Sequence, residues 1–66
     1  MPQVKVPERV YDDLSRFVNA YYSNNLPNSL IVAQAFILKH HDYGKEFGFF
    51  AINNAIEDGI KQGLFY

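Results

Sequence analysis

Apolar residues recur at helical spacing in three segments of the chain, and the first segment covers residues 7–22. Its apolar stripe consists of Val10, Leu14, Phe17, Val18 and Tyr21. Charged and polar residues fill the opposite side, which is the pattern of an amphipathic helix. Pro7 suits the first position of a helix, where its missing N–H would have no partner anyway. The pattern therefore predicts a helix over residues 7–22.

The second segment, residues 29–40, is apolar on all sides. Gln34 is the only polar residue between Leu30 and Leu38, and Asn28 or Ser29 can cap the N-terminal end. A buried strand is the competing interpretation, because period alone does not assign a short apolar run. The length and the Ala and Leu content favour a helix. Since a helix that is apolar all round must be covered all round, we expect either a central helix in a tight three-helix arrangement or a homodimer interface.

The third segment, residues 45–63, carries an apolar stripe that includes three isoleucines and two glycines. Gly44, just before it, suits a left-handed cap between the second and third helices. A glycine inside a helix costs about 1 kcal/mol relative to Ala, so interior glycines need a reason. For Gly59 and Gly63 we expect close approach of another backbone.

Residues 3–6 alternate polar and apolar side chains, which predicts a short extended arm and leaves open whether it forms a strand. Val4 and Val6 can pack this arm over the first helix. The sequence therefore predicts an all-α fold, a compact three-helix domain with an N-terminal arm, in which residues 1–66 form one domain.

Candidate catalytic and metal-binding groups are sparse. A chain of 66 residues has little room for a deep substrate cleft, and without cysteine it has no thiol nucleophile. His40, His41 and Asp42 are adjacent, so their side chains point in different directions, and the chain has no other His or Cys to complete a metal site. We expect a solvated helix end at the two histidines, no metal, no cofactor and no enzymatic activity.

Charge and hydropathy narrow the classes of partner. The chain contains no apolar run of the roughly 18 residues that a membrane span needs, and no leader-like N-terminus, so we expect a cytoplasmic protein without membrane contact. Its formal net charge is −1. This argues against nucleic-acid binding by bulk electrostatics, which uses clustered Lys and Arg.

The aromatic content points to a protein partner. Five Tyr and six Phe are more than the interior of so small a domain can hide, since each large ring buries about 150–250 Å². The residues outside the core stripes are Tyr22, Phe50, Phe65 and Tyr66, which become the candidate contacts. The alternative is that Phe50 completes the core and the tail is disordered. The sequence thus predicts a non-enzymatic protein-interaction module that forms a homodimer.

The N-terminal half, residues 3–40, resembles the ribbon-helix-helix family. A short polar and apolar alternation leads into a helix that opens with Pro7 and an acidic residue, and a second helix follows a polar turn. The resemblance implies an intertwined dimer whose paired strands read bases in the major groove, here through Gln3 and Lys5. It therefore supplies the alternative function, a dimeric DNA-binding transcriptional regulator.

The two ends of the chain resemble a group of short phage and prophage proteins. The shared features are the Val6-Pro7-Glu8-Arg9-Val10-Tyr11 start and the Gly59-Ile60-Lys61-Gln62-Gly63 ending, which an aromatic residue follows. This resemblance implies a small accessory protein of a mobile element that binds and modulates a host protein.

Overall fold

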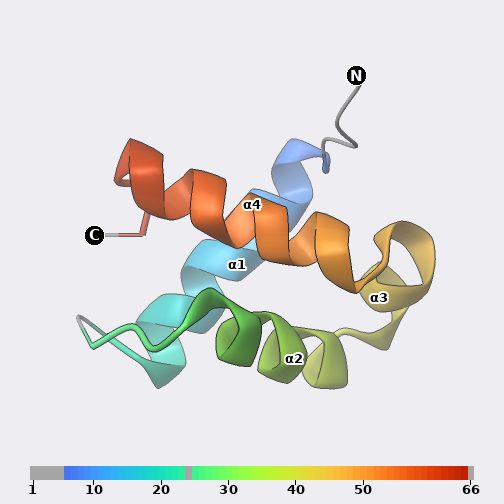
Figure 1. The fold of residues 1–66 in the computed structure, drawn as a ribbon, viewed down its shortest axis with the longest axis horizontal. Coiled ribbons are helices and arrows are strands. Elements are labelled where there is room, and N and C mark those ends of the chain that lie inside the picture. Colours follow the sequence, from blue (N-terminus) through green and yellow to red (C-terminus); the bar gives the residue numbers. More distant parts are fainter. Residues whose placement is uncertain (1–5, 24, 66) are drawn as a thin grey trace.

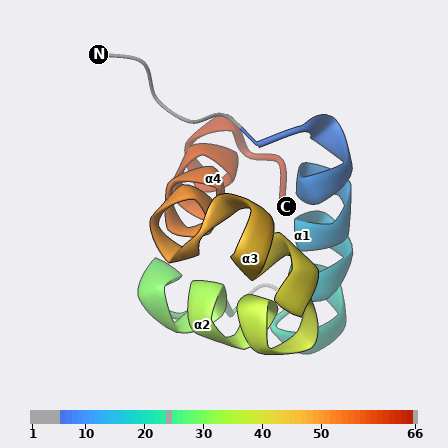
Figure 2. The same cartoon turned by 90° about the vertical axis from the view of Figure 1, so that its right-hand side faces the viewer.

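Four helices follow one another in the computed structural model, which describes residues 6–23 and 25–65. They are α1 (Glu8–Tyr21), α2 (Ser29–Lys39), α3 (His41–Phe47) and α4 (Phe49–Gln62). In Figure 1, α2 and α4 lie side by side, α1 crosses behind them, and α3 joins the end of α2 to the start of α4. Figure 2 shows α3 from the front, with α1 and α4 on either side of it. Since the described residues contain helices and turns and no strand, the all-α prediction is confirmed.

The predicted count of three helices is wrong because the third segment is two helices. Gly48 interrupts it with φ 89° and ψ 164°, a backbone conformation that is essentially restricted to glycine. The preceding helix begins at His41, so Gly44 lies inside α3 and is not a cap. A Cβ added at Gly44 would lie 2.7 Å from Cγ2 of Ile37. Glycine at this position therefore lets α3 approach α2 closely.

The other helix ends follow the sequence closely. α1 begins after Pro7, which occupies the N-cap position, and the Asn28 side chain caps α2 by accepting a hydrogen bond from the Leu30 N–H at 2.8 Å. Gly63 ends α4 in the left-handed conformation, with φ 71°. Nothing lies within 4 Å of a Cβ added at Gly63, so the expected close approach is wrong there. Gly63 serves instead as a left-handed C-cap.

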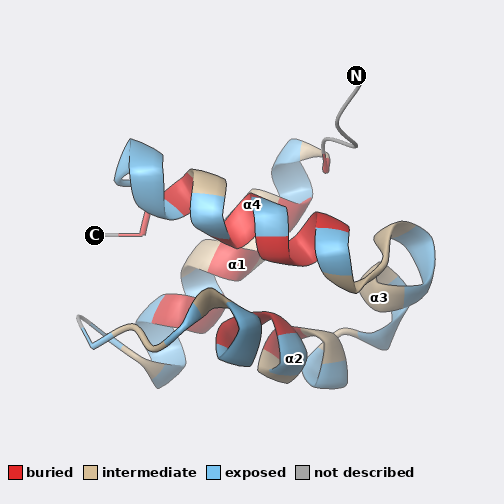
Figure 3. Ribbon diagram, viewed as in Figure 1, coloured by how far each residue is buried: buried red, intermediate tan, exposed pale blue. Residues whose placement is uncertain are grey.

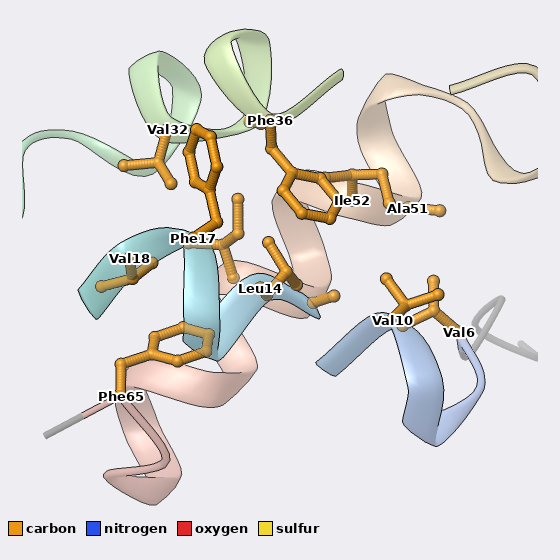
Figure 4. Close-up of a cluster of buried hydrophobic side chains, with 13 residues drawn as sticks. Val6, Val10, Leu14, Phe17, Val18, Val32, Phe36, Ala51, Ile52 and Phe65 are labelled. Carbon is orange, nitrogen blue, oxygen red and sulfur yellow. The ribbon is translucent and has the colours of Figure 1, made fainter. Parts of the chain in front are cut away.

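At Gly59 the expectation of crowding is correct, but the neighbour is a side chain and not a backbone. A Cβ added at Gly59 would lie 2.5 Å from Cζ of Phe65. The chain turns back after Gly63, and Figure 4 shows the Phe65 ring directed into the cluster of buried side chains. The glycine thus makes room for the aromatic ring that closes this end of the core.

One hydrophobic core joins α1, α2 and α4 (Figure 4). Its members are Val6, Val10, Leu14, Phe17, Val18, Val32, Ala33, Phe36, Ala51, Ile52, Ala55, Ile56 and Phe65. The half-buried Tyr43 and Phe47 of α3 pack against this cluster. Because Val6 is buried, it holds the chain over α1 as predicted, whereas residues 3–5 and the question of a strand lie outside the described residues.

Polar contacts attach α3 to α1. The Tyr43 hydroxyl donates a hydrogen bond to Oδ2 of Asp13 at 2.6 Å, and the guanidinium of Arg9 lies 3.2 Å from a carboxylate oxygen of Glu46. The hydrogen bond to Asp13, together with burial, raises the pKa of the Tyr43 hydroxyl. These contacts hold α3 against α1, where Tyr43 and Phe47 pack on the core.

Candidate protein-interaction surface

The outer face of α2 is the most apolar exposed surface of the described chain. Leu30, Ile31 and Leu38 are 48 %, 54 % and 72 % exposed, and the side chain of Gln34 is exposed between them. At about 100° per residue, these four positions fall on one side of the helix. We call them the α2 outer face.

The inner face of the same helix is fully buried. Val32, Ala33 and Phe36 have no exposed surface, and they pack in the core with α1 and α4. Figure 3 shows the change from buried to exposed positions around the α2 ribbon. The option of a central helix covered by its own chain is therefore wrong, because the flanking helices cover only one side of α2.

A pocket of about 400 Å³ lies beside the α2 outer face, where the end of α2, α3 and the start of α4 meet. Its lining residues are Ile37, His41, Gly44, Lys45 and Phe49. Ile37 and Phe49 provide apolar walls, while the exposed His41 and Lys45 place polar atoms beside them. The one signal of this pocket in the sequence is Gly44, which lies inside α3 against Ile37 and does not form the predicted cap.

The aromatic residues form a continuous cluster around Phe36. Its ring contacts Phe17 edge-on, with centroids 5.4 Å apart, and stacks on Tyr43 at 5.9 Å. The His40 imidazole lies 4.6 Å from the Phe36 ring, so this histidine is half-buried among aromatics and the expected solvated position is wrong for it. His41 is exposed as expected. The cluster accounts for more of the aromatic residues than the helical stripes predicted.

The four predicted partner contacts divide between surface and interior. Phe50 is 77 % exposed, so the alternative in which it completes the core is wrong. Tyr22 is half-buried, with its ring 6.0 Å from that of Phe17. Phe65 is only 2 % exposed, and its assignment as a surface contact is wrong because its ring fills the space above Gly59. Tyr66 lies outside the described residues.

Across residues 6–23 and 25–65, no three His, Asp or Glu side chains gather where they would hold a metal ion. None of the helices in this part of the chain is long and apolar enough to span a membrane. Gln3 and Lys5, the candidate base-reading residues, lie outside the described residues.

Comparison with protein-family models, with curated proteins and with solved structures finds no match to this chain.

Proposed function

We propose that this protein is a non-enzymatic interaction module that binds protein through the α2 outer face. The observation that carries the proposal is the exposure of Leu30, Ile31 and Leu38 on one side of a helix whose other side is fully buried. Single exposed apolar residues are common, whereas a contiguous apolar patch marks an interaction site. Covering such a patch contributes about 25 cal/mol for each Å² of apolar surface removed from water.

Phe50 is a second contact in this proposal, separate from the α2 outer face. It is the most exposed large apolar residue described, but its neighbour one turn along α4 is the exposed, polar Asn54. Its ring packs edge-on against the half-buried Phe49, with centroids 5.8 Å apart, so Phe50 offers a single exposed aromatic anchor and not a patch. An anchor of this kind suits a partner that provides a pocket for a single ring.

A second copy of the chain is the first partner that the proposal includes, since the apolar face would otherwise stay in water. The similarity of both chain ends to short phage and prophage proteins supports a further role, in which the module binds and modulates a host protein. Phe50 is then available for that second partner.

The fold supports the ribbon-helix-helix alternative less well. In that family the two helices bury their apolar faces against a second chain, whereas here Leu14 of α1 and Phe36 of α2 share a core with Ile52 of α4 in the same chain. A regulator that reads bases through Gln3 and Lys5 would still bind DNA by phosphate contacts at low salt, and this binding would weaken steeply as salt rises.

Two measurements on the purified chain test the proposal. Sedimentation velocity from low to high micromolar concentration should show a monomer and a dimer in concentration-dependent exchange. Fluorescence anisotropy with a random-sequence DNA duplex at low salt should show no binding. A monomer at every concentration would overturn self-association through α2. DNA binding that weakens as salt rises would favour the transcriptional regulator.

A further inference from the structure

We infer that the partner of the α2 outer face is a second copy of this chain, packed so that two α2 helices run antiparallel about a two-fold axis at Gln34. This inference rests on the proposed function and specifies its geometry. Three features of the described residues lead to it: the arrangement of apolar residues around Gln34, the pocket beside Ile37, and the charges at the two ends of α2.

The apolar residues of the α2 outer face, together with the half-buried Ile37 beside it, are spaced symmetrically along the sequence around Gln34. Leu30 and Leu38 lie four residues before and after it, and Ile31 and Ile37 lie three residues before and after it. Gln34 is also the middle residue of Ser29–Lys39. In an interface with two-fold symmetry the same patch is used twice, so each contact between positions i and j is repeated as j with i. An axis at Gln34 covers the whole apolar face of both copies, whereas any other register leaves apolar residues exposed at the ends.

The pocket beside α2 is placed to receive a side chain from this arrangement. In an antiparallel pair centred on Gln34, Leu30 of the second copy lies over Ile37, at the edge of the pocket that Ile37 and Phe49 line. Ile31 of the second copy lies against Leu38. Filling the pocket with the Leu30 side chain removes apolar surface of both copies from water, which favours association.

The charges along α2 favour the antiparallel over the parallel orientation. The Ser29 hydroxyl donates a hydrogen bond to Oε2 of Glu57 at 3.2 Å, which places an acidic group at the N-terminal end of α2. Lys45 and His41 line the pocket at the C-terminal end. Glu57 of α4 and Lys45 of α3 therefore lie along the same side of α2, at its opposite ends. Antiparallel packing brings Glu57 of each copy to Lys45 of the other, while parallel packing would bring like charges together.

Gln34 fixes the register. A side-chain amide carries both donors and an acceptor, so two Gln34 side chains at the axis can donate to and accept from each other. One polar residue within an apolar helix interface typically selects a single alignment, because other alignments leave the amide buried without a partner.

Disulfide cross-linking tests this geometry directly, because the chain has no cysteine of its own. Gln34→Cys places one thiol at the proposed axis, and mild oxidation should give a covalent dimer in high yield. Asn19→Cys is the matched control: Asn19 is exposed on α1, away from α2, and should not cross-link. A wild-type dimer in sedimentation whose Gln34→Cys variant stays unlinked would overturn the geometry and leave the proposed function standing. A wild-type protein that stays monomeric at every concentration would overturn self-association through α2, and the geometry inferred here with it.

Charge reversal tests the orientation by a separate measurement. Glu57→Lys and Lys45→Glu should each raise the dimer dissociation constant about two- to tenfold, and the double variant should recover most of the loss. Recovery requires the two residues to meet across the interface. A double variant that associates no better than either single variant would overturn the antiparallel orientation.

Discussion

The helices α1 and α2 pack against the same core, but the side chains on their solvent-exposed sides differ in polarity. In α1, the stripe residues Val10, Leu14 and Val18 have no exposed surface, and the outer side is polar apart from Tyr21, which is 59 % exposed at the end of the helix. In α2, Val32 and Phe36 are equally buried, but the outer side carries aliphatic residues that are about half to three-quarters exposed. A small domain covers only about one side of each helix. The exposed apolar residues on the other side of α2 are the basis of our proposal that this helix contacts a partner.

The largest effect on the free energy of unfolding is expected on the buried side of α2, in contrast to its exposed side. Phe36→Ala removes a fully buried ring that contacts Phe17 and Tyr43, and should lower the free energy of unfolding by about 3–5 kcal/mol. Leu38→Ala should change it by less than about 0.5 kcal/mol in dilute solution, where the chain is a monomer. Urea denaturation measures both. Equal losses would show that the chain itself covers both sides of α2.

A smaller effect is expected at the covered side of α4, where Gly59 faces the buried Phe65 ring. Gly59→Ala should destabilise the protein, because about 2 kcal/mol of overpacking outweighs the gain of about 1 kcal/mol in helix propensity. Gly63→Asn is the control, since asparagine tolerates the left-handed conformation found there. Thermal melting compares the two variants, and a raised melting temperature for Gly59→Ala would contradict the packing described.

The polar contacts of α1 should contribute about 1 kcal/mol and depend on pH. Tyr43→Phe deletes the hydrogen bond to Asp13, and the loss should be close to that value. The folded-state pKa of Tyr43 is raised by this hydrogen bond, and that of Tyr11 is raised by burial and by the carboxylate of Asp58. The unfolded chain therefore loses these protons first, so the stabilisation is complete below about pH 10 and declines as pH rises above it.

Denaturation at neutral and alkaline pH measures this dependence. Tyr43→Phe should show a smaller decline than the wild type above about pH 10, since it has one fewer tyrosine to ionise. An identical decline in both proteins would contradict the role of the Tyr43 hydroxyl.

The smallest effect is expected at the exposed ion pair between α1 and α3. Arg9 and Glu46 approach within 3.2 Å, but both side chains are more than half exposed. Pairs of this kind contribute about 0.2–1 kcal/mol and are screened by salt. Glu46→Gln should therefore change the unfolding free energy by no more than that amount, and the difference should vanish at high salt. A loss larger than that of Tyr43→Phe would show that α3 depends on its ion pair.

The fold was predictable where helical period and cap chemistry act locally. The α1 stripe, the Asn28 cap and the start of α2 at Ser29 all depend on neighbouring residues, and the structure confirms them except at Tyr21, the last stripe residue, which is exposed. The break at Gly48 was not predictable in this way. The sequence contains glycines at 44, 48, 59 and 63, and only the tertiary arrangement decides which one breaks a helix, which one caps it and which ones make room for Ile37 and Phe65.

The candidate surface was predictable only where a signal lies within one segment of the sequence. An all-round apolar pattern in residues 29–40 indicated that α2 needs more cover than one chain supplies, and this depends on composition alone. The interpretation of Phe65 as a surface contact is wrong because it treats the residues after Gly63 as a loose chain end, whereas the left-handed turn at Gly63 brings the ring back over Gly59, six residues earlier. The pocket beside Ile37 was missed because it forms between three helices.

The dimer dissociation constant, measured by sedimentation equilibrium in three proteins, tests most directly whether the α2 outer face is an interface. We predict a reversible wild-type dimer, a Leu38→Ser variant whose dissociation constant is at least about tenfold higher, and a Leu64→Ser variant that associates like the wild type. Leu38 and Leu64 are both exposed leucines, so loss of exposed apolar surface alone does not distinguish the two variants. A wild-type protein that stays monomeric, or a dimer that Leu64→Ser weakens and Leu38→Ser does not, would show that the α2 outer face is not the interface.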